Sequence, residues 1–232
     1  MNPKSATAFL FDMDGTLIDS SRPMERIWGR WARRHGLDFA ALLPTIHGVR
    51  AIDTVRRLAI PGVDPLVEAR IIDREEVEDV DGVTPIAGAI EFLAALPPER
   101  WTVVTLAPRA LARARLGAAK IPVPAALVSG EDVAAGKPAP DCYLLGAKRL
   151  GFEAADCIVF EDAAAGIESA VAAGAEIVMI ASAQAHQPSS GRFAVSDYNQ
   201  LELMVGPDRL HIRLRPVAAR EATSTTTRRR LP

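Results

Sequence analysis

The sequence predicts an α/β protein: a doubly wound, Rossmann-like core around a parallel sheet, with an inserted all-helical cap domain. Two observations support this prediction. First, short apolar runs alternate with segments of helical periodicity, and continuously apolar runs are typical of parallel strands that are covered on both faces. Second, the alternation stops between residues 19 and 83, where only helical patterns occur. The predicted core is therefore discontinuous along the chain.

Five apolar runs are interpreted as buried strands, and they lie at residues 8–11, 101–106, 125–128, 157–160 and 177–180. Helical patterns lie between them, at residues 86–94, 110–116, 143–150 and 167–173. In a βαβ arrangement of this kind, ligands bind at the carboxyl ends of the strands. Residues 209–214 alternate in polarity and predict an edge strand. We assign residues 1–18 and 84–215 to this core.

The insertion, which we assign to residues 19–83, contains three helical patterns, at about 21–35, 52–59 and 65–80. The first begins with a serine cap and Pro23 in its first turn, and Gly36 ends it. Because no strand pattern intervenes, we interpret the insertion as a small helical cap. Trp28 and Trp31 fall on the apolar stripe of the first helix and are interpreted as its core, the alternative being a wall against a substrate.

Composition narrows the possible function classes. The chain has 232 residues, 49% of them hydrophobic and 24% charged, which suffices for one sizeable core or a core with a small second domain. A net charge of −2 gives no reason to expect binding to nucleic acid or to a membrane surface. No apolar run approaches the roughly 20 residues that span a bilayer. With no signal-peptide pattern and only two cysteines, we expect a cytoplasmic protein.

The last part of the sequence, residues 216–232, contains almost nothing to bury and predicts a disordered tail. An arginine triplet, Arg228 to Arg230, lies in this tail. It is interpreted as solvated rather than as a nucleic-acid patch, because nothing else in the chain is strongly basic.

The segment that most strongly indicates a functional site follows the first predicted strand and reads Asp12-Met13-Asp14-Gly15-Thr16. Alternation in an extended backbone puts Asp12 and Asp14 on the same side. Two carboxylates this close need a cation or a shared proton to compensate them. Gly15 then permits a tight turn with positive φ. The pattern favours a site for a hard cation such as Mg²⁺ and for carboxylate chemistry, and the alternative is an ordinary Asp-Gly turn.

Four segments together resemble the ordered motifs of the haloacid dehalogenase superfamily of phosphohydrolases. They are Asp12 to Thr16, Val103-Val104-Thr105, Gly136-Lys137-Pro138 and Phe160-Glu161-Asp162-Ala163. The resemblance covers roughly residues 6 to 182. Within the superfamily, the chain is most similar to small phosphatases of sugar and polyol phosphates, whose helical cap follows the first motif.

This resemblance implies catalytic roles for the motif residues. Asp12 would be the nucleophile that forms an aspartyl-phosphate, and Asp14 would act as general acid and then as general base. Thr16 would orient Asp14 by a hydrogen bond. Lys137 would neutralise charge on the transferring phosphoryl group, the alternative for it being a plain surface lysine.

The resemblance also implies a Mg²⁺ site. The Asp12 side chain, the Asp14 backbone carbonyl and Asp162 would hold the ion, with Glu161 either among the ligands or just behind them. Alternatively, Glu161 and Asp162 form an ordinary acidic junction in which the aspartate caps the next helix.

Two segments are expected to bind substrate. Thr105 would bind phosphate, assisted by the backbone N–H groups of Leu106 and Ala107. The family usually has Thr-Ser-Gly or Thr-Asn-x where this chain has Thr105-Leu106-Ala107, so Leu106 lacks a polar side chain and predicts lower turnover or a less polar substrate. In the cap, Gly48 and Arg50 resemble a loop that meets substrate, where Arg50 would clamp a hydroxyl or a second phosphate. A surface salt bridge is the alternative for Arg50.

The function predicted from these motifs is a Mg²⁺-dependent phosphatase that hydrolyses a small sugar or polyol phosphate through an aspartyl-phosphate. A phosphosugar mutase of the β-phosphoglucomutase type is one alternative, but such mutases carry a histidine where this chain has Met24. A catalytically weak phosphosugar-binding protein is another, suggested by Leu106. A small phosphorylated metabolite is the expected partner. The sequence does not fix the oligomeric state, and a monomer is compatible with it.

Overall fold

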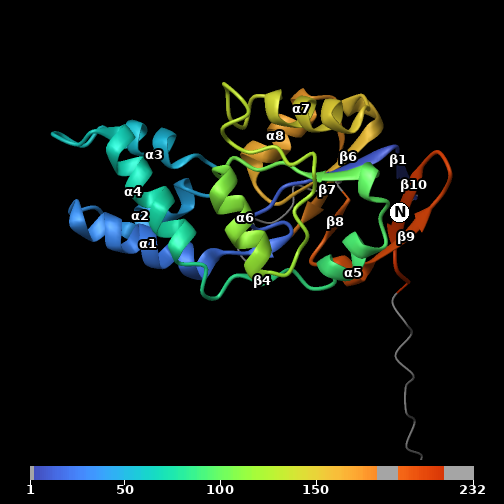
Figure 1. The fold of residues 1–232 in the computed structure, drawn as a ribbon, viewed down its shortest axis with the longest axis horizontal. Helices are drawn as coiled ribbons and strands as arrows, with labels where there is room; N and C mark the ends of the chain where they lie inside the picture. Colours follow the sequence, from blue (N-terminus) through green and yellow to red (C-terminus); the bar gives the residue numbers. More distant parts are fainter. Residues whose placement is uncertain (1–2, 182–192, 217–232) are drawn as a thin grey trace, which may run out of the picture.

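The computed structural model describes residues 3–181 and 193–216. Its centre is a five-stranded sheet of order β5-β2-β6-β7-β8, in which all neighbouring strands are parallel (Figure 1). The strands are β2 (Ala8–Phe11), β5 (Trp101–Val103), β6 (Cys157–Glu161), β7 (Glu176–Ile180) and β8 (Ala194–Val195). The predicted doubly wound α/β core is confirmed.

Helices cover both faces of this sheet. Alternate residues of β2 face opposite sides: Phe9 and Phe11 pack in one buried cluster, and Ala8 and Leu10 in another. The first cluster includes residues of α5 (Ala89–Ala94) and α6 (Arg109–Ala118), and the second includes residues of α7 (Asp141–Leu150) and α8 (Ala164–Ala172). Burial on both faces explains why β2 reads as a continuous apolar run.

Two predicted strands differ from the structure. The run at 101–106 is a strand only as far as Val103, and Val104 then makes one isolated parallel bridge to Val128. The run at 125–128 therefore contributes a bridge and not a strand. Pro122 and Pro124 precede it, and proline cannot donate a ladder hydrogen bond. β8, which the sequence analysis did not identify, is the fifth strand instead.

A separate antiparallel sheet has the order β1-β10-β9. Its strands are β1 (Lys4–Ala6), β9 (Leu201–Val205) and β10 (Leu210–Leu214). The predicted edge strand at 209–214 is thus the central strand, because β1 and β9 pair on either side of it. Short 3₁₀ turns complete the core: η2 (Pro98–Arg100), η3 (Ala154–Asp156) and η4 (Tyr198–Gln200).

Between β3 (Ile18–Asp19) and β4 (Thr84–Pro85) the chain is helical. The elements are α1 (Ser21–Arg34), α2 (Phe39–Leu42), η1 (Leu43–Thr45), α3 (Ala51–Leu58) and α4 (Pro65–Glu78). We call residues 19–83 the helical segment. It has its own buried cluster, which contains Trp28 and Trp31. β3 and β4 pair antiparallel, so the chain enters and leaves this segment at neighbouring points.

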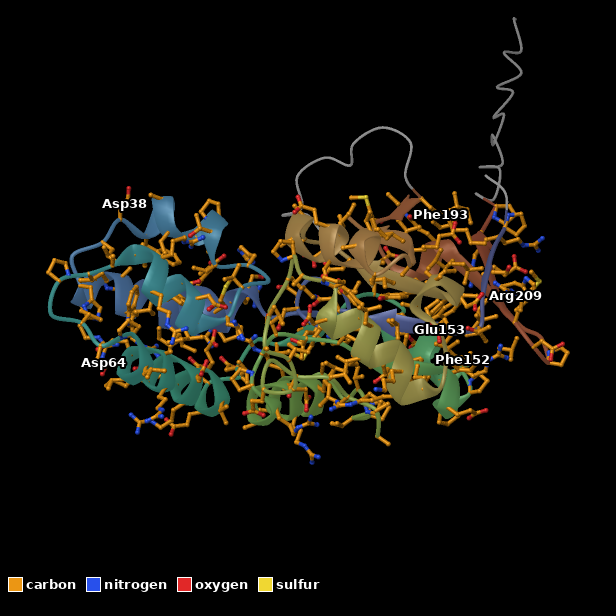
Figure 2. All side chains as sticks on the ribbon, turned by 90° about the horizontal axis from the view of Figure 1, so that it is seen from above. Asp38, Asp64, Phe152, Glu153, Phe193 and Arg209 are labelled. Carbon is orange, nitrogen blue, oxygen red and sulfur yellow. The ribbon has the colours of Figure 1, made fainter. Side chains whose placement is uncertain are left out.

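The helical segment lies beside the core along the longest axis of the molecule (Figure 1). Asp38 and Asp64, which cap α2 and α4 through their side chains, mark its outer end, and Phe193 and Arg209 mark the opposite end of the core (Figure 2). No helix within the described ranges is both long and apolar enough to cross a bilayer. Apart from residue 216, the predicted disordered tail lies outside the described residues.

Candidate active site

A cavity of about 1360 Å³ opens at the carboxyl ends of the parallel strands, between the core and the helical segment. Three of its polar residues follow neighbouring strands: Asp12 comes directly after β2, Asp162 after β6, and Thr105 two residues after β5. Lys137 reaches the same point from the loop before α7. The opposite wall includes Trp28 and residues 43–51 of the helical segment. The cavity therefore brings the predicted motifs together.

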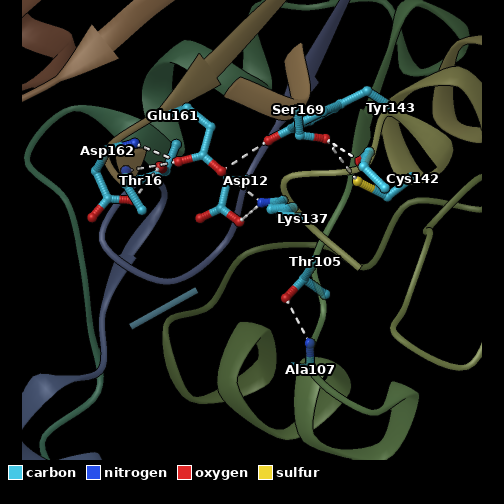
Figure 3. A network of polar contacts seen from close by, with 12 residues as sticks. Asp12, Thr16, Thr105, Ala107, Lys137, Cys142, Tyr143, Glu161, Asp162 and Ser169 are labelled. Carbon is cyan, nitrogen blue, oxygen red and sulfur yellow. Dashed lines mark hydrogen bonds and ion pairs between the residues drawn. The ribbon is translucent and has the colours of Figure 1, made fainter. Parts of the chain in front are cut away.

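Lys137 lies between two carboxylates (Figure 3). Its Nζ is 2.6 Å from Asp12 Oδ1 and 2.6 Å from Glu161 Oε1, and its side chain is 1% exposed. Burial alone would lower the pKa of Lys137, but the two carboxylates outweigh it and hold the pKa well above its ordinary value. Lys137 is thus a buried, charged side chain, and the alternative of a plain surface lysine is wrong.

Opposing effects act on the pKa of Asp12. Burial raises its pKa from 3.8 to about 7, despite the lowering effect of Lys137, and the charges of Glu161 and Asp14 add to the increase. This balance is expected where several acids share one buried cation. Without a further cation, the carboxyl group of Asp12 is therefore only partly ionised at neutral pH.

Glu161 has partners for both carboxylate oxygens. Oε1 accepts from Lys137 and, at 3.0 Å, from the buried Tyr143 hydroxyl. Oε2 accepts from the backbone N–H groups of Asp162 and Ala163, each at 2.8 Å. Gly166 of α8 makes this placement possible, because a Cβ there would lie 1.6 Å from Oε1. Glu161 is therefore fixed as a support for Lys137 and the following turn.

Asp162 lies against the turn after β2. Thr16 Oγ1 donates to Asp162 Oδ1 at 3.2 Å, and a Cβ on Gly15, where φ is +86°, would lie 2.1 Å from Oδ2. Only glycine leaves room for this approach at such a φ. Burial, together with Glu161 and Asp12, raises the pKa of Asp162 well above its ordinary value.

Asp12, Glu161 and Asp162 fit a cation. They offer carboxylate oxygens that lie within 4.8 Å of one another, and Lys137 is one positive charge against three acids. Oxygen-only donor sets suit hard cations such as Mg²⁺. The raised pKa values of Asp12 and Asp162 indicate the same need for positive charge.

Asp14 has different partners from those predicted. Thr16 was predicted to orient Asp14 by a hydrogen bond, but Thr16 donates to Asp162. Asp14 Oδ1 instead accepts from Ser20 Oγ at 2.6 Å and from Arg115 Nη1 at 3.0 Å. Ser20 occupies the N-cap of α1 but makes no side-chain capping bond, and its hydroxyl instead points to Asp14, to which it donates.

The predicted phosphate loop lines the cavity. Thr105 Oγ1 accepts from the N–H of Ala107 at 3.1 Å, so this N–H is engaged within the loop (Figure 3). Leu106 is 6% exposed, and its side chain lies against Gly136, where a Cβ would be 3.1 Å from it. Leu106 therefore packs two loops of the core against each other.

Gly48 and Arg50 bring the helical segment close to the core. A Cβ on Gly48 would lie 3.5 Å from Ala163 Cβ. Arg50 Nε pairs with Asp53 Oδ2 at 2.6 Å, and Nη1 donates to the Ala134 carbonyl at 3.5 Å. Arg50 thus forms the salt bridge given as its alternative while also lining the cavity.

Sequence reasoning missed four residues of this network: Ser20, Arg115 and Tyr143, and also Glu76 of α4, whose Oε1 accepts from Arg115 Nη2 at 3.1 Å. Arg115 carried a signal, since it falls on the stripe of α6 formed by Leu111, Ala112 and Leu116, all of which are buried. A charge on an apolar stripe calls for a buried partner. Glu76 and Tyr143 carried none, because their partners lie 39 and 18 residues away in the sequence. Ser20 is only six residues from Asp14, but its place at the start of a helix indicated a cap instead.

Comparison with known proteins identifies the family. Residues 6–174 match the haloacid dehalogenase-like hydrolase model. Hexitol phosphatase A of Escherichia coli (strain K12) is 42% identical over 176 residues, which cover 74% of this chain and 82% of the relative. Glycerol-1-phosphate phosphohydrolase 1 of Saccharomyces cerevisiae is 32% identical over 75% of this chain and 74% of the relative. The chain belongs to the haloacid dehalogenase-like hydrolases, and the predicted resemblance is confirmed.

A solved structure shares the fold. The haloacid dehalogenase hydrolase, family IA, variant 3, of Entamoeba histolytica superposes with a TM-score of 0.72, covering 84% of this chain and 95% of that one. Its sequence is 24% identical, so this comparison bears on the fold alone. It agrees with the parallel α/β core described above.

Proposed function

We propose that this hydrolase is a Mg²⁺-dependent phosphatase that hydrolyses a small sugar or polyol phosphate through an aspartyl-phosphate. The observation that carries the proposal is the buried Asp12 carboxylate, held by Lys137 at the floor of the cavity, with Asp14 two residues away. Family membership and the two curated relatives, whose names give them as phosphatases of polyol phosphates, support a phosphoric monoester hydrolase.

The proposed reaction has two steps. As Asp12 bonds to phosphorus, the ester bond to the leaving oxygen breaks, and that oxygen takes a proton from Asp14. Water then attacks phosphorus and gives a proton to Asp14, and the bond between phosphorus and the Asp12 oxygen breaks, which releases inorganic phosphate and restores both aspartates. Lys137 compensates negative charge at the phosphoryl group, and Thr105 and the Leu106 N–H bind its oxygens.

Mg²⁺ would be held by the carboxylates of Asp12 and Asp162 and by the Asp14 backbone carbonyl. When bound, it supplies positive charge for the phosphoryl oxygens. Glu161 would stand behind these ligands, because both its oxygens already accept hydrogen bonds. The motif allowed two roles for Glu161, as a ligand of the ion or as a residue behind the ligands, and we propose the second.

We propose that the helical segment acts as a cap that covers the leaving group. Its residues 43–51 form the wall opposite Asp12, and the β3–β4 pair is the joint on which it would move. The charge of Arg50 is balanced by Asp53, which favours a neutral, hydroxyl-bearing leaving group over one with a second phosphate. Met24 in place of a histidine argues against the mutase alternative.

The test is phosphate release from a panel of hexitol, glycerol and hexose phosphates, with Mg²⁺ and with EDTA. We expect release from at least one polyol phosphate that needs Mg²⁺. Interconversion of phosphosugar isomers without phosphate release would instead indicate a mutase. Stabilisation by a phosphosugar with no turnover on any substrate would indicate a binding protein.

A further inference from the structure

Arg115 is a buried charge that the proposed reaction leaves without a role. It lies on the apolar face of α6 and is 5% exposed. Burying a guanidinium is costly unless its donors are paired, and a buried pair that loses one partner is strongly destabilised. The partners of Arg115 are therefore informative.

These partners come from two parts of the molecule. Arg115 Nη1 is 3.0 Å from Asp14 Oδ1, in the turn after β2, and Nη2 is 3.1 Å from Glu76 Oε1, near the end of α4. Glu76 is itself 7% exposed. One guanidinium thus joins the proposed acid of the core to a buried carboxylate of the helical segment, where α4 packs on α6.

We infer that Arg115 is a positioning residue for Asp14, and that Glu76 holds Arg115 in place from the helical segment. Ser20 and Arg115 both bind Oδ1, which fixes the carboxylate by one oxygen and leaves Oδ2 to meet the leaving group. The packing of α4 on α6 and the orientation of the Asp14 carboxylate are then coupled. This inference rests on the proposed function.

The proposal makes a prediction about leaving groups. Arg115 compensates the negative charge that Asp14 gains when its proton moves to the leaving oxygen. A sugar or polyol alkoxide needs that proton, whereas p-nitrophenolate departs as a stable anion. A positioning role therefore matters for alkyl phosphates and little for p-nitrophenyl phosphate. A purely structural role would affect both alike.

The test measures kcat/KM with glycerol 1-phosphate, a hexitol phosphate and p-nitrophenyl phosphate. kcat/KM covers the steps up to leaving-group departure, so the later hydrolysis of the aspartyl-phosphate does not enter. For Arg115→Lys we expect a loss of ~10–100-fold with the alkyl phosphates, which is less than the ~10²–10⁴-fold expected for removing the acid itself, and less than ~3-fold with p-nitrophenyl phosphate. Glu76→Gln should give a smaller loss with the same selectivity, and the two changes should not add.

Arg113→Lys is the matched control, because Arg113 is exposed on the same helix, and it should leave all three values unchanged. Circular dichroism checks that the variants fold, and Glu76→Gln, which keeps the side-chain shape, tests the proposal should Arg115→Lys fail to fold. Equal losses on all substrates would overturn the role of Arg115 alone. Absence of turnover by the unchanged chain on every phosphate ester would overturn the proposed function together with this inference.

Discussion

Asp12 shows how a single residue can be made reactive at some expense of stability. Its carboxylate lies in a buried site with two further acids and only Lys137 to compensate them. Such a group is only partly ionised at neutral pH, and a bound cation favours its ionised form. The buried acids around the proposed nucleophile therefore lower the stability of the folded chain when Asp12 is ionised and no metal is bound.

Replacing the two aspartates of the first motif should separate their roles. Asp12→Asn should fold normally and lose at least ~10³-fold in kcat, because the covalent route is removed. Asp14→Asn should lose ~10²–10⁴-fold, which is typical of a general acid or base. The losses should not add in the double variant. Steady-state kinetics measures this, and wild-type turnover by Asp12→Asn would refute the mechanism.

The raised pKa of Asp12 predicts a pH dependence of stability. A carboxyl with a pKa of 3.8 when unfolded and about 7 when folded binds its proton more tightly in the folded state. Its contribution to the free energy of unfolding is complete below about pH 4 and is lost as pH rises to about 7. The Tm of Asp12→Asn minus that of the unchanged chain should therefore increase by at least ~2 °C across this window.

Scanning calorimetry in EDTA at pH values between 4 and 7.5 would measure this difference. Asp79→Asn is the control, because the pKa of that surface carboxyl is lowered by Arg26 and its contribution changes only in more acidic solution. A difference between Asp12→Asn and the unchanged chain that stays constant with pH would contradict the prediction.

At this scale, sequence reasoning grouped residues where the signal was local. Asp12, Asp14, Lys137 and Asp162 were singled out because each lies in a short motif, and the structure brings all four to one cavity. The partner of Thr16 was assigned wrongly. Asp162 is 146 residues further along the chain, and motif spacing says nothing about which carboxylate a hydroxyl will meet across that distance.

At the scale of elements, α8 supports the site because Gly166 has no side chain and so leaves room for the Glu161 carboxylate. Gly166→Ala places a Cβ against the Glu161 carboxylate, which must then move away from Lys137 and Tyr143. We expect a destabilisation of ~1–3 kcal/mol, as for overpacked cores, together with a loss of activity. Gly117→Ala in α6 is the matched control, because no atom lies near its Cβ position.

Urea denaturation and kinetics of both variants would test this. The control should be as stable as the unchanged chain or more so, by up to ~1 kcal/mol, since alanine favours a helix over glycine. Unchanged stability and activity in Gly166→Ala would show that Glu161 can be displaced without consequence.

The start of α3 should govern preference for the leaving group. Arg50, its N-cap residue, faces the cavity from the helical segment, so Arg50→Ala should lower kcat/KM severalfold for a preferred polyol phosphate. p-Nitrophenyl phosphate, which has no hydroxyls to clamp, should be hydrolysed almost as before. Arg56→Ala, an exposed change on the same helix, serves as control. Equal losses on both substrates would assign Arg50 to the phosphate or to the scaffold.

Elements with a strong periodic signal were predicted well, and short ones were not. The helices at 65–80 and 143–150 and the strand at 8–11 follow from apolar patterning, because their own burial defines them. β8 has two residues and exists only because β7 lies beside it. Such elements depend on partners that are distant in sequence, and a local pattern cannot reveal them.

For the whole molecule, metal binding should be linked to proton release. The pKa of Asp12 is raised to about 7 and that of Asp162 is raised as well, so we expect Mg²⁺ that enters the site near neutral pH to displace protons, from Asp12 at least. Titration calorimetry in two buffers of different ionisation enthalpy should report this release, and Mg²⁺ should raise the Tm. Asp162→Ala should weaken Mg²⁺ binding more than Glu161→Ala. Identical binding heats in the two buffers would contradict the linkage.

The pairing of β3 with β4 has a consequence for how such proteins diversify. Asp19 and Thr84 are paired across the two strands, so the two ends of a 64-residue excursion meet at one point. A different excursion grafted onto the same two anchors would leave the strand order of the parallel sheet untouched. Evolution can therefore exchange the part that we propose to cover the leaving group, while the part that we propose to bind the phosphoryl group is inherited unchanged.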